Sequence, residues 1–333
     1  MTSPSAANPD ARVPLPAVAT SSFGVGASRP MAVNTVTSGT PTWLGPFFWF
    51  ARTCPTAASL LKPMASALVP MVSPRVREAI RKNTPWLFGR KLSSTQQRLF
   101  ARQVVGSFYD FVLDVGRASQ MTPQQLVNLV ERVEGLEGYR AARAQRRGAI
   151  LVTAHLGTYE VGLAALAHEE KKVRVVFKRD PSPGFEQMRA GLHRTLGVIE
   201  SPIDDGIETW LSLREALLND EVVVMQADRA VKGQKSEVVP FLHGHLRMPT
   251  GPVRLAQLTG SPIIPVFALP SGTGGYHVLL KPAIEPHAPA ALDRDSGPSA
   301  VLRALADAMA QVVAAYPHLW LALEAVFHED EVA

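Results

Sequence analysis

A histidine and a glutamate stand five positions apart where an apolar run gives way to a polar segment. The run 150–154 is apolar and β-branched, His155 follows it directly, and Gly157 and Thr158 lead into a stretch typical of a helix. Glu160 falls in the first turn of that helix. An imidazole that a carboxylate holds through one nitrogen can take a proton on the other. The spacing predicts that His155 and Glu160 form a general-base pair that activates a hydroxyl group for attack on an acyl carbon. The alternative is a strand-end histidine that hydrogen bonds only to backbone groups.

The elements that would position this pair alternate along the chain. Apolar runs predict strands at 149–154, 173–178, 221–227 and 262–268, with shorter strands at 238–242 and 276–281. Helical spacing of apolar residues predicts helices at 95–119, 158–169, 184–196, 206–219 and 299–315. Alternation of this kind predicts an α/β fold whose central sheet is mostly parallel and flanked by helices.

Charged residues stand at the ends of two further predicted strands. Lys178 and Arg179 close one strand, and Asp228 and Arg229 follow another. In open α/β sheets ligands bind at the carboxyl ends of the strands, and cations there suit phosphate groups. These side chains predict a substrate site beside the histidine, with ordinary surface charge as the alternative. Arg143 and Arg146, by contrast, are expected on the solvated face of a helix.

Several familiar kinds of site are missing from the sequence. It has no Gly-x-Ser-x-Gly elbow, no phosphate-binding P-loop, no His-Glu-x-x-His and no Gly-x-Gly-x-x-Gly fingerprint. Its single cysteine, Cys54, excludes an intramolecular disulfide and a Cys-x-x-Cys metal site. His243 and His245 have no carboxylate near them in the sequence and are interpreted as loop histidines. We therefore expect neither a metal nor a cofactor.

The amino-terminal part of the chain differs in composition from the rest. Residues 1–40 are rich in Ser, Thr, Ala, Pro and Gly and predict a disordered tail. Residues 43–72 are apolar, with an aromatic cluster at 43–50, but prolines and charges interrupt every window long enough to span a bilayer. Short interfacial helices are the better interpretation.

Basic residues gather in the next part of the chain. Residues 75–147 hold 14 Lys and Arg against 6 Asp and Glu, although the whole chain has a net charge of only +5. The stretch 75–91 mixes basic and aromatic side chains, a composition that suits an anionic membrane surface. We therefore predict a helical membrane-associating segment at 41–94, ahead of a catalytic domain at 95–330. The alternatives are that the helices of 43–72 pack on the core of that domain and that 75–91 is a solvated helix face.

The motifs occur in an order that resembles one known family. They are His155-x-x-x-x-Glu160, a strand ending in Lys178-Arg179, Ala227-Asp228-Arg229, the segment 241–252 (Phe-Leu-His-Gly-His-Leu-Arg-Met-Pro-Thr-Gly-Pro) and the segment 255–267 (Leu-Ala-Gln-Leu-Thr-Gly-Ser-Pro-Ile-Ile-Pro-Val-Phe). Together they resemble, over residues 43–327, the bacterial lipid A biosynthesis acyltransferase family of the wider glycerolipid acyltransferase superfamily. Within it the motifs look most like those of phosphatidylinositol mannoside acyltransferases.

The resemblance implies a chemistry and assigns roles to residues. It implies acyl transfer from acyl-CoA or an acyl carrier protein to a lipid-linked acceptor, without a metal, a cofactor or a covalent acyl-enzyme. His155 would be the general base and Glu160 its partner. The residues expected to bind or orient the substrates are Lys178, Arg179, Asp228, Arg229 and Arg247.

The function expected from the sequence is that of a membrane-surface O-acyltransferase with a glycolipid acceptor. It would be peripheral, on the cytoplasmic face of the inner or plasma membrane. A nucleic-acid partner is not expected, because no groove-reading or base-stacking motif is present. Three other functions remain open: a glycerophospholipid acyltransferase, whose usual Glu-Gly-Thr-Arg signature is missing, a thioesterase, and a non-catalytic membrane-binding protein of the same fold.

Overall fold

The computed structural model describes residues 50, 53–180, 182–231, 233–286 and 299–328, which all belong to one compact unit that begins at residue 39. The predicted tail at 1–40, and the aromatic cluster at 43–50 apart from Phe50, lie outside the described residues. Among the residues described, no helix is both long and apolar enough to cross a membrane.

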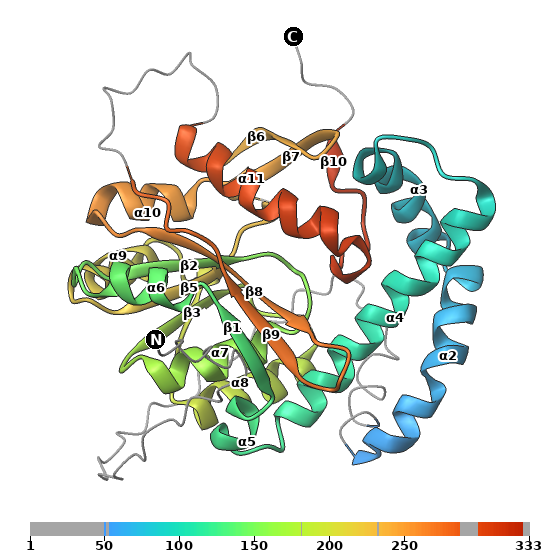
Figure 1. The fold of residues 1–333 in the computed structure, drawn as a ribbon, viewed down its shortest axis with the longest axis horizontal. Coiled ribbons are helices and arrows are strands. Elements are labelled where there is room, and N and C mark those ends of the chain that lie inside the picture. Colours follow the sequence, from blue (N-terminus) through green and yellow to red (C-terminus); the bar gives the residue numbers. More distant parts are fainter. Residues whose placement is uncertain (1–49, 51–52, 181, 232, 287–298, 329–333) are drawn as a thin grey trace, which may run out of the picture. The chain divides into compact units, whose positions relative to one another are not determined.

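A seven-stranded sheet forms the centre of this unit (Figure 1). The strand order is β1-β9-β8-β2-β5-β3-β4, and every neighbouring pair is parallel except β8 with β9. The strands are β1 (Val130–Glu134), β2 (Ala149–Thr153), β3 (Val173–Phe177), β4 (Ile199–Pro202), β5 (Val222–Gln226), β8 (Ile263–Pro270) and β9 (Tyr276–Leu280). The predicted α/β fold with a mostly parallel central sheet is therefore confirmed.

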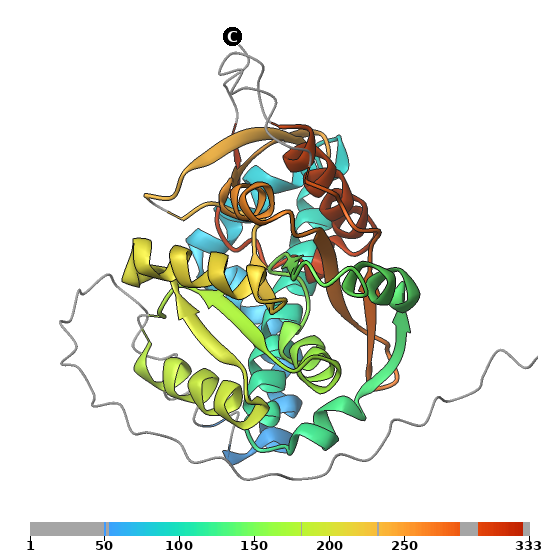
Figure 2. The ribbon, with the colours of Figure 1, turned by 90° about the vertical axis from the view of Figure 1, so that its left-hand side faces the viewer.

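The inner strands are apolar throughout because helices cover both faces of the sheet. All five residues of β2 are buried, with Ile150 and Val152 in one core cluster and Ala149 and Leu151 in the other. The first cluster packs under α9 (Ile207–Leu218), α10 (Gly251–Thr259) and α11 (Ala300–Ala315). The second packs under α5 (Pro123–Val127), α6 (Leu136–Arg143), α7 (Tyr159–Glu169) and α8 (Pro183–Leu196). Figure 2 shows the sheet between α9 and α10 on one side and α8 on the other.

Two strands at the edges of the sheet, β1 and β4, are absent from the sequence prediction. β1 reads Val-Glu-Arg-Val-Glu and is mostly exposed. β4 reads Ile-Glu-Ser-Pro and is only four residues long. Neither strand has the apolar run that marks a buried strand, so only its pairing with a neighbour defines it.

In the described part of the chain, the long helices ahead of α5 and the sheet are α2 (Pro55–Val72), α3 (Pro74–Phe88) and α4 (Ser94–Ala118). Residues 55–72 form one helix that continues through Pro63 and Pro70, so the prediction of several short helices is wrong for this part of the chain. α4, which the apolar spacing predicts, begins where Ser93 and Gln96 form a reciprocal capping box. α2 packs along α4 and lies outside it (Figure 1).

A second sheet, antiparallel and three-stranded, has the order β10-β7-β6, with β6 (Ser236–Phe241), β7 (Gly244–Pro249) and β10 (Phe327–His328). The turn between β6 and β7 docks on the end of α3, where the backbone N–H of His243 donates to the carbonyl of Trp86 at 3.1 Å. Trp86 and Phe88 are partly buried and pack against the core. These two aromatic side chains of the basic stretch thus contact the protein itself, which neither a membrane-facing segment nor a solvated helix face predicts.

Candidate active site

His155 lies in the tight turn between β2 and α7. β2 ends at Thr153, and Gly157 then adopts a φ of 68°, in the left-handed region. A Cβ on Gly157 would come within 2.3 Å of the carbonyl oxygen of Ala268, so only glycine satisfies both the conformation and the space. The turn leaves the side chain of His155 40% exposed, which gives a substrate hydroxyl access to the ring.

Asp228 occupies the matching place on the neighbouring strand. β2 and β5 pair in parallel with Thr153 opposite Gln226, so the residues two positions beyond each of them, His155 and Asp228, come side by side. Nδ1 of His155 lies 2.6 Å from Oδ1 of Asp228. The side chain of Asp228 has no solvent exposure. A buried carboxylate therefore holds one nitrogen of the imidazole and leaves the other free.

The carboxylate of Asp228 is surrounded by donors. Nε1 of Trp320 donates to Oδ2 at 2.8 Å, and the guanidinium of Arg229 lies 3.2 Å from the same oxygen. Burial alone would raise the pKa of Asp228, but the positive charges of protonated His155 and of Arg229, with the hydrogen bonds from His155 and Trp320, hold it well below its ordinary value. An ionised carboxylate only accepts hydrogen bonds, so in the neutral imidazole Nδ1 carries the proton and Nε2 has a free lone pair.

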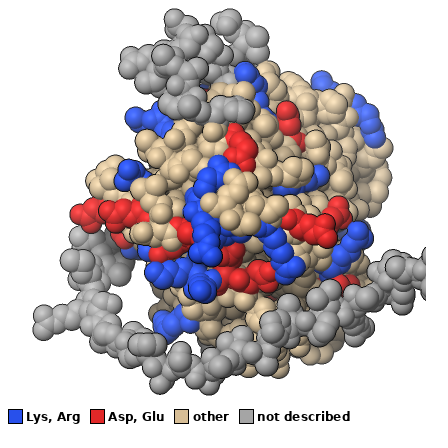
Figure 3. Space-filling view, turned by 60° about the vertical axis from the view of Figure 1, so that its left-hand side comes forward, with Lys and Arg blue, Asp and Glu red and all other residues tan. Residues whose placement is uncertain are grey.

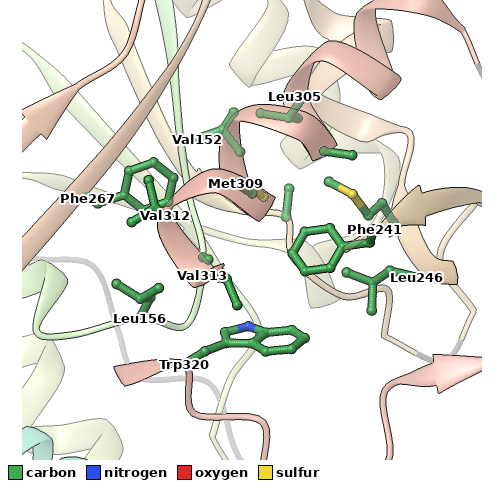
Figure 4. Close-up of a cluster of buried hydrophobic side chains, with 14 of the residues drawn as sticks. Val152, Leu156, Phe241, Leu246, Phe267, Leu305, Met309, Val312, Val313 and Trp320 are labelled. Carbon is green, nitrogen blue, oxygen red and sulfur yellow. The ribbon is translucent and has the colours of Figure 1, made fainter. Parts of the chain in front are cut away.

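The carboxyl-terminal segment fixes this turn in place. The backbone N–H of Leu321 donates to the carbonyl of His155 at 2.8 Å, and Leu156 forms an antiparallel bridge with Trp320. The indole of Trp320 is almost fully buried and packs 5.6 Å from the ring of Phe241, inside the cluster of Figure 4. Its N–H is thereby held toward the carboxylate.

Glu160 does not hold the imidazole of His155. Its side chain is fully buried in the first turn of α7, and no other residue among those described hydrogen bonds to either carboxylate oxygen. Burial, and the charge of Asp114, raise the pKa of Glu160 to about 8 against the opposing effects of its own backbone N–H and of Arg189. The predicted contact between His155 and Glu160 is therefore wrong, because α7 carries Glu160 into the interior while the ring turns to the neighbouring strand.

A second buried carboxylate, Asp114 on α4, connects the turn that carries His155 to two other elements. It accepts hydrogen bonds from the hydroxyl of Thr158 at 2.9 Å and from that of Tyr276, on β9, at 2.5 Å. Burial raises the pKa of Asp114, and these two hydrogen bonds oppose the rise. Thr158 is the N-cap residue of α7, but its hydroxyl makes no capping bond to that helix. Asp114 therefore joins α4, β9 and the start of α7 three residues after His155.

The predicted substrate cations differ in their surroundings. Arg179 follows β3 and is half exposed, and its guanidinium forms a two-point ion pair with Asp205 at 2.6 and 3.1 Å. Lys178 is exposed. Arg247 lies on β7, where its carbonyl accepts the backbone N–H of Ala230 at 3.0 Å. This bond brings β7 beside the segment that follows β5.

Trp320 also lines a small apolar cavity between α3, α4 and the carboxyl-terminal segment. The residues that line it are Ile80, Asn83, Leu87, Phe100, Val104, Pro317, Trp320 and Ala322. The amide nitrogen of Asn83 donates to the carbonyls of Ala322 and Glu324, so the free lining of this cavity is apolar. Within the described part of the chain, no group of three or more His, Cys, Asp or Glu side chains could hold a metal ion.

Comparison with known proteins agrees with this architecture. The model of the family described as bacterial lipid A biosynthesis acyltransferase matches residues 33–329. The chain belongs to this acyltransferase family. A phosphatidylinositol mannoside acyltransferase of Mycobacterium tuberculosis (strain CDC 1551 / Oshkosh) is 29% identical over 251 residues, which cover 74% of this chain and 76% of the relative. One of Mycolicibacterium smegmatis is 25% identical over 250 residues, which cover 74% and 78%. The resemblance found in the sequence is confirmed, and the protein is an acyltransferase of lipid biosynthesis.

Several residues near His155 in this lipid acyltransferase are not predicted from the sequence. Trp320 belongs to the segment Pro317-His-Leu-Trp320, which shares in the family resemblance, but nothing in that segment indicates a bond to a carboxylate. Asp114 gives a weak signal, because it is an acidic residue among the apolar positions of a helix. Thr158 and Tyr276 give none, since only the fold brings their hydroxyl groups together.

Proposed function

We propose that this acyltransferase works at a membrane surface and moves a fatty acyl group from an acyl thioester, carried by CoA or an acyl carrier protein, to a hydroxyl of a glycolipid. The observation that carries the proposal is the bond from Nδ1 of His155 to buried Asp228. It leaves Nε2 as a proton acceptor on a ring that is open to a substrate. The names of the mycobacterial relatives support a glycolipid acceptor.

His155 acts as the general base in this reaction. Nε2 takes the proton of the acceptor hydroxyl as its oxygen attacks the thioester carbonyl carbon. The C–S bond then breaks, and the departing sulfur receives the proton from the imidazolium. Asp228 stabilises the imidazolium, and general-base catalysis of this kind contributes about 10²–10⁴-fold in rate.

Cations that follow β3, and one on β7, bind the phosphate groups of the substrates. Lys178 is exposed and Arg179 half exposed after β3, and Arg247 lies on β7. Arg229 already contacts Asp228, so we assign it to orienting that carboxylate. The enzyme is peripheral and works on the cytoplasmic face of the membrane, where acyl thioesters are supplied. It needs no metal or cofactor for this step.

The decisive experiment supplies the purified chain with a panel of acyl-CoAs and acyl carrier proteins together with a lipid extract. We expect an acylated glycolipid in the mass spectrum, and its loss with His155→Ala. Thioester consumption at full rate without any lipid product would instead identify a thioesterase. No consumption of any thioester would contradict the proposal.

A further inference from the structure

Asp114 is an acidic residue among buried apolar residues of α4. Its neighbours Leu113 and Val115 are 3% and 0% exposed. On the face of the molecule in Figure 3, Asp and Glu side chains lie next to Lys and Arg. The carboxylate of Asp114 instead has two hydroxyl groups as partners: Oδ2 accepts from Thr158 at 2.9 Å and from Tyr276 at 2.5 Å. A bond from a hydroxyl to a carboxylate is about twice as strong as one between neutral groups, so these two contacts tie α4 to both partners.

The bond to Asp114 takes the hydroxyl of Thr158 away from its usual role. A threonine at the N-cap of a helix normally accepts a hydrogen bond from the backbone N–H two or three residues ahead, as Thr122 does at the start of α5. Thr158 is the N-cap residue of α7, but its side chain makes no such bond. It is buried, and its hydroxyl donates to α4 instead. The bond therefore places the start of α7 against α4 and does not cap α7.

Thr158 ends the short turn that His155 begins. Two residues separate them, and one of these is Gly157, whose φ of 68° and backbone bridge to β8 hold it in place. The first part of the turn is held by the carboxyl-terminal segment, where the backbone N–H of Leu321 donates to the carbonyl of His155. The last part is held by Asp114. Because the turn is short and held at both ends, a displacement of Thr158 is passed on to His155.

Tyr276 connects the same carboxylate to the central sheet. It is the first residue of β9 and is buried. Its backbone N–H donates to the carbonyl of Leu129 at 2.8 Å, and β9 pairs with both β1 and β8. One oxygen of Asp114 thus receives one hydroxyl from the sheet and one from the turn that carries His155. α4 thereby fixes the position of this turn relative to the sheet.

We propose that Asp114 is a positioning residue for acyl transfer, which acts through the hydroxyl of Thr158 on the turn that carries His155. Its bonds go to Thr158 and Tyr276 and not to the imidazole, so it takes no part in the proton transfer itself. A shift of a reacting group by about 1 Å can cost about 10²-fold in rate, and substrate binding need not change. The inference rests on the proposed function, which makes His155 the general base.

The test measures kcat and KM of the full-length chain with the lipid extract and the acyl-CoA that it uses best. Thr158→Val removes the hydroxyl and keeps the shape of the side chain, whereas Thr158→Ser keeps the hydroxyl. Tyr276→Phe removes the second bond to Asp114. Its matched control is Tyr109→Phe, because Tyr109 is also buried and its hydroxyl donates, from α4, to the carbonyl of Ala58 at 2.6 Å. Thermal unfolding gives the stability of each variant.

Thr158→Val should lower kcat about 10-fold and leave KM nearly unchanged, because the base is displaced while the substrates still bind. Tyr276→Phe should lower kcat in the same way. Thr158→Ser should keep the parent kcat. Tyr109→Phe should also keep it, although the loss of a buried hydrogen bond makes this variant less stable. Asp114→Asn should keep most of the activity, since an amide oxygen can accept both hydroxyl groups.

Three results would overturn the inference. The first is an equal loss of kcat in Thr158→Val and Thr158→Ser, and the second is an equal loss in Tyr276→Phe and Tyr109→Phe, which would show a general loosening of α4. The third is a parent-level kcat in Thr158→Val while His155→Ala is inactive, which would leave the proposed function standing. Full transfer by His155→Ala would instead remove the proposed function, and this inference with it.

Discussion

Replacing Asp228 with asparagine keeps the size of the side chain and removes its charge. We expect Asp228→Asn to lower the rate of acyl transfer by about 10²-fold or more, because an amide cannot stabilise the imidazolium of His155. Glu160→Gln is the matched control, since Glu160 is buried without a contact to the ring. Transfer rates at saturating donor check both variants, with folding confirmed by circular dichroism. Equal losses in the two variants would show that Asp228 has no special place beside His155.

Glu160 should make the stability of the protein depend on pH. Its pKa is about 8 in the folded protein and near 4.5 when unfolded, so the folded state holds a proton that the unfolded state releases between these values. The free energy of unfolding should therefore fall by roughly 3–5 kcal/mol as the pH rises from 4.5 to 8. Glu160→Gln should lack this part of the decline. Urea unfolding of both proteins across this range measures it, and parallel pH profiles would contradict the pKa of Glu160.

At the level of single residues, the sequence predicts where His155 lies but not which carboxylate it meets. A run of apolar residues that ends at a histidine locates the end of a strand. Its partner lies 73 positions away, and the two meet only because β2 pairs with β5. Local spacing does not reveal the order of strands in a parallel sheet. A prediction from the sequence therefore pairs His155 with the nearby Glu160, which is wrong.

At the level of elements, the turn between β2 and α7 depends on one glycine. Gly157→Ala would place a methyl group 2.3 Å from a backbone carbonyl at a φ of 68°, so we expect a loss of at least about 3 kcal/mol in stability and of most activity. Gly197→Ala has a φ of 69° with no atom near the new methyl. It should cost only about 1 kcal/mol and leave transfer intact. Chemical unfolding and transfer assays compare the two, and similar costs would show that the turn can adjust.

The elements themselves differ in how far their sequences determine them. The buried strands and the long helix α4 follow from apolar period alone. β1 and β4 do not follow from apolar period, because an edge strand is only partly buried. Its extended conformation depends on hydrogen bonds to the neighbouring strand. The sequence also does not predict that α2 is one continuous helix. Pro63 and Pro70 indicate breaks in the helix, and the packing of α2 on α4 overrides them.

At the level of the whole molecule, the two ends of the parallel strands serve different purposes. The site lies at the carboxyl ends, while at the amino ends Arg143 pairs with Glu170 at 2.9 Å and also bonds Asp220. Arg143 is only 13% exposed, so its predicted place on a solvated face is wrong: α6 turns it toward the start of β5. This ion pair joins α6, the end of α7 and the turn before β5.

Arg143→Ala should therefore lower the stability of the protein without changing its rate of acyl transfer. Removing one partner of a largely buried ion pair leaves unpaired charge behind, so we expect a loss of about 2–4 kcal/mol in the free energy of unfolding. Arg146→Ala, at an exposed position, should change it by less than about 1 kcal/mol. Activity per folded molecule should stay at the parent level in both. A fall in turnover with Arg143→Ala, at temperatures where it remains folded, would contradict this separation.

The contact of Trp320 and Leu321 with the turn that carries His155 has a consequence for the synthesis of the protein. During synthesis, β2 and β5 emerge from the ribosome well before residue 320, so a nascent chain can build its sheet while His155 still lacks both the indole beside its carboxylate and the strand that holds its carbonyl. We therefore expect activity to appear only after Trp320 and Leu321 have been synthesised and have reached this turn. Chains released early by a stop codon before residue 317 would contain His155 and Asp228, and we expect them to be inactive.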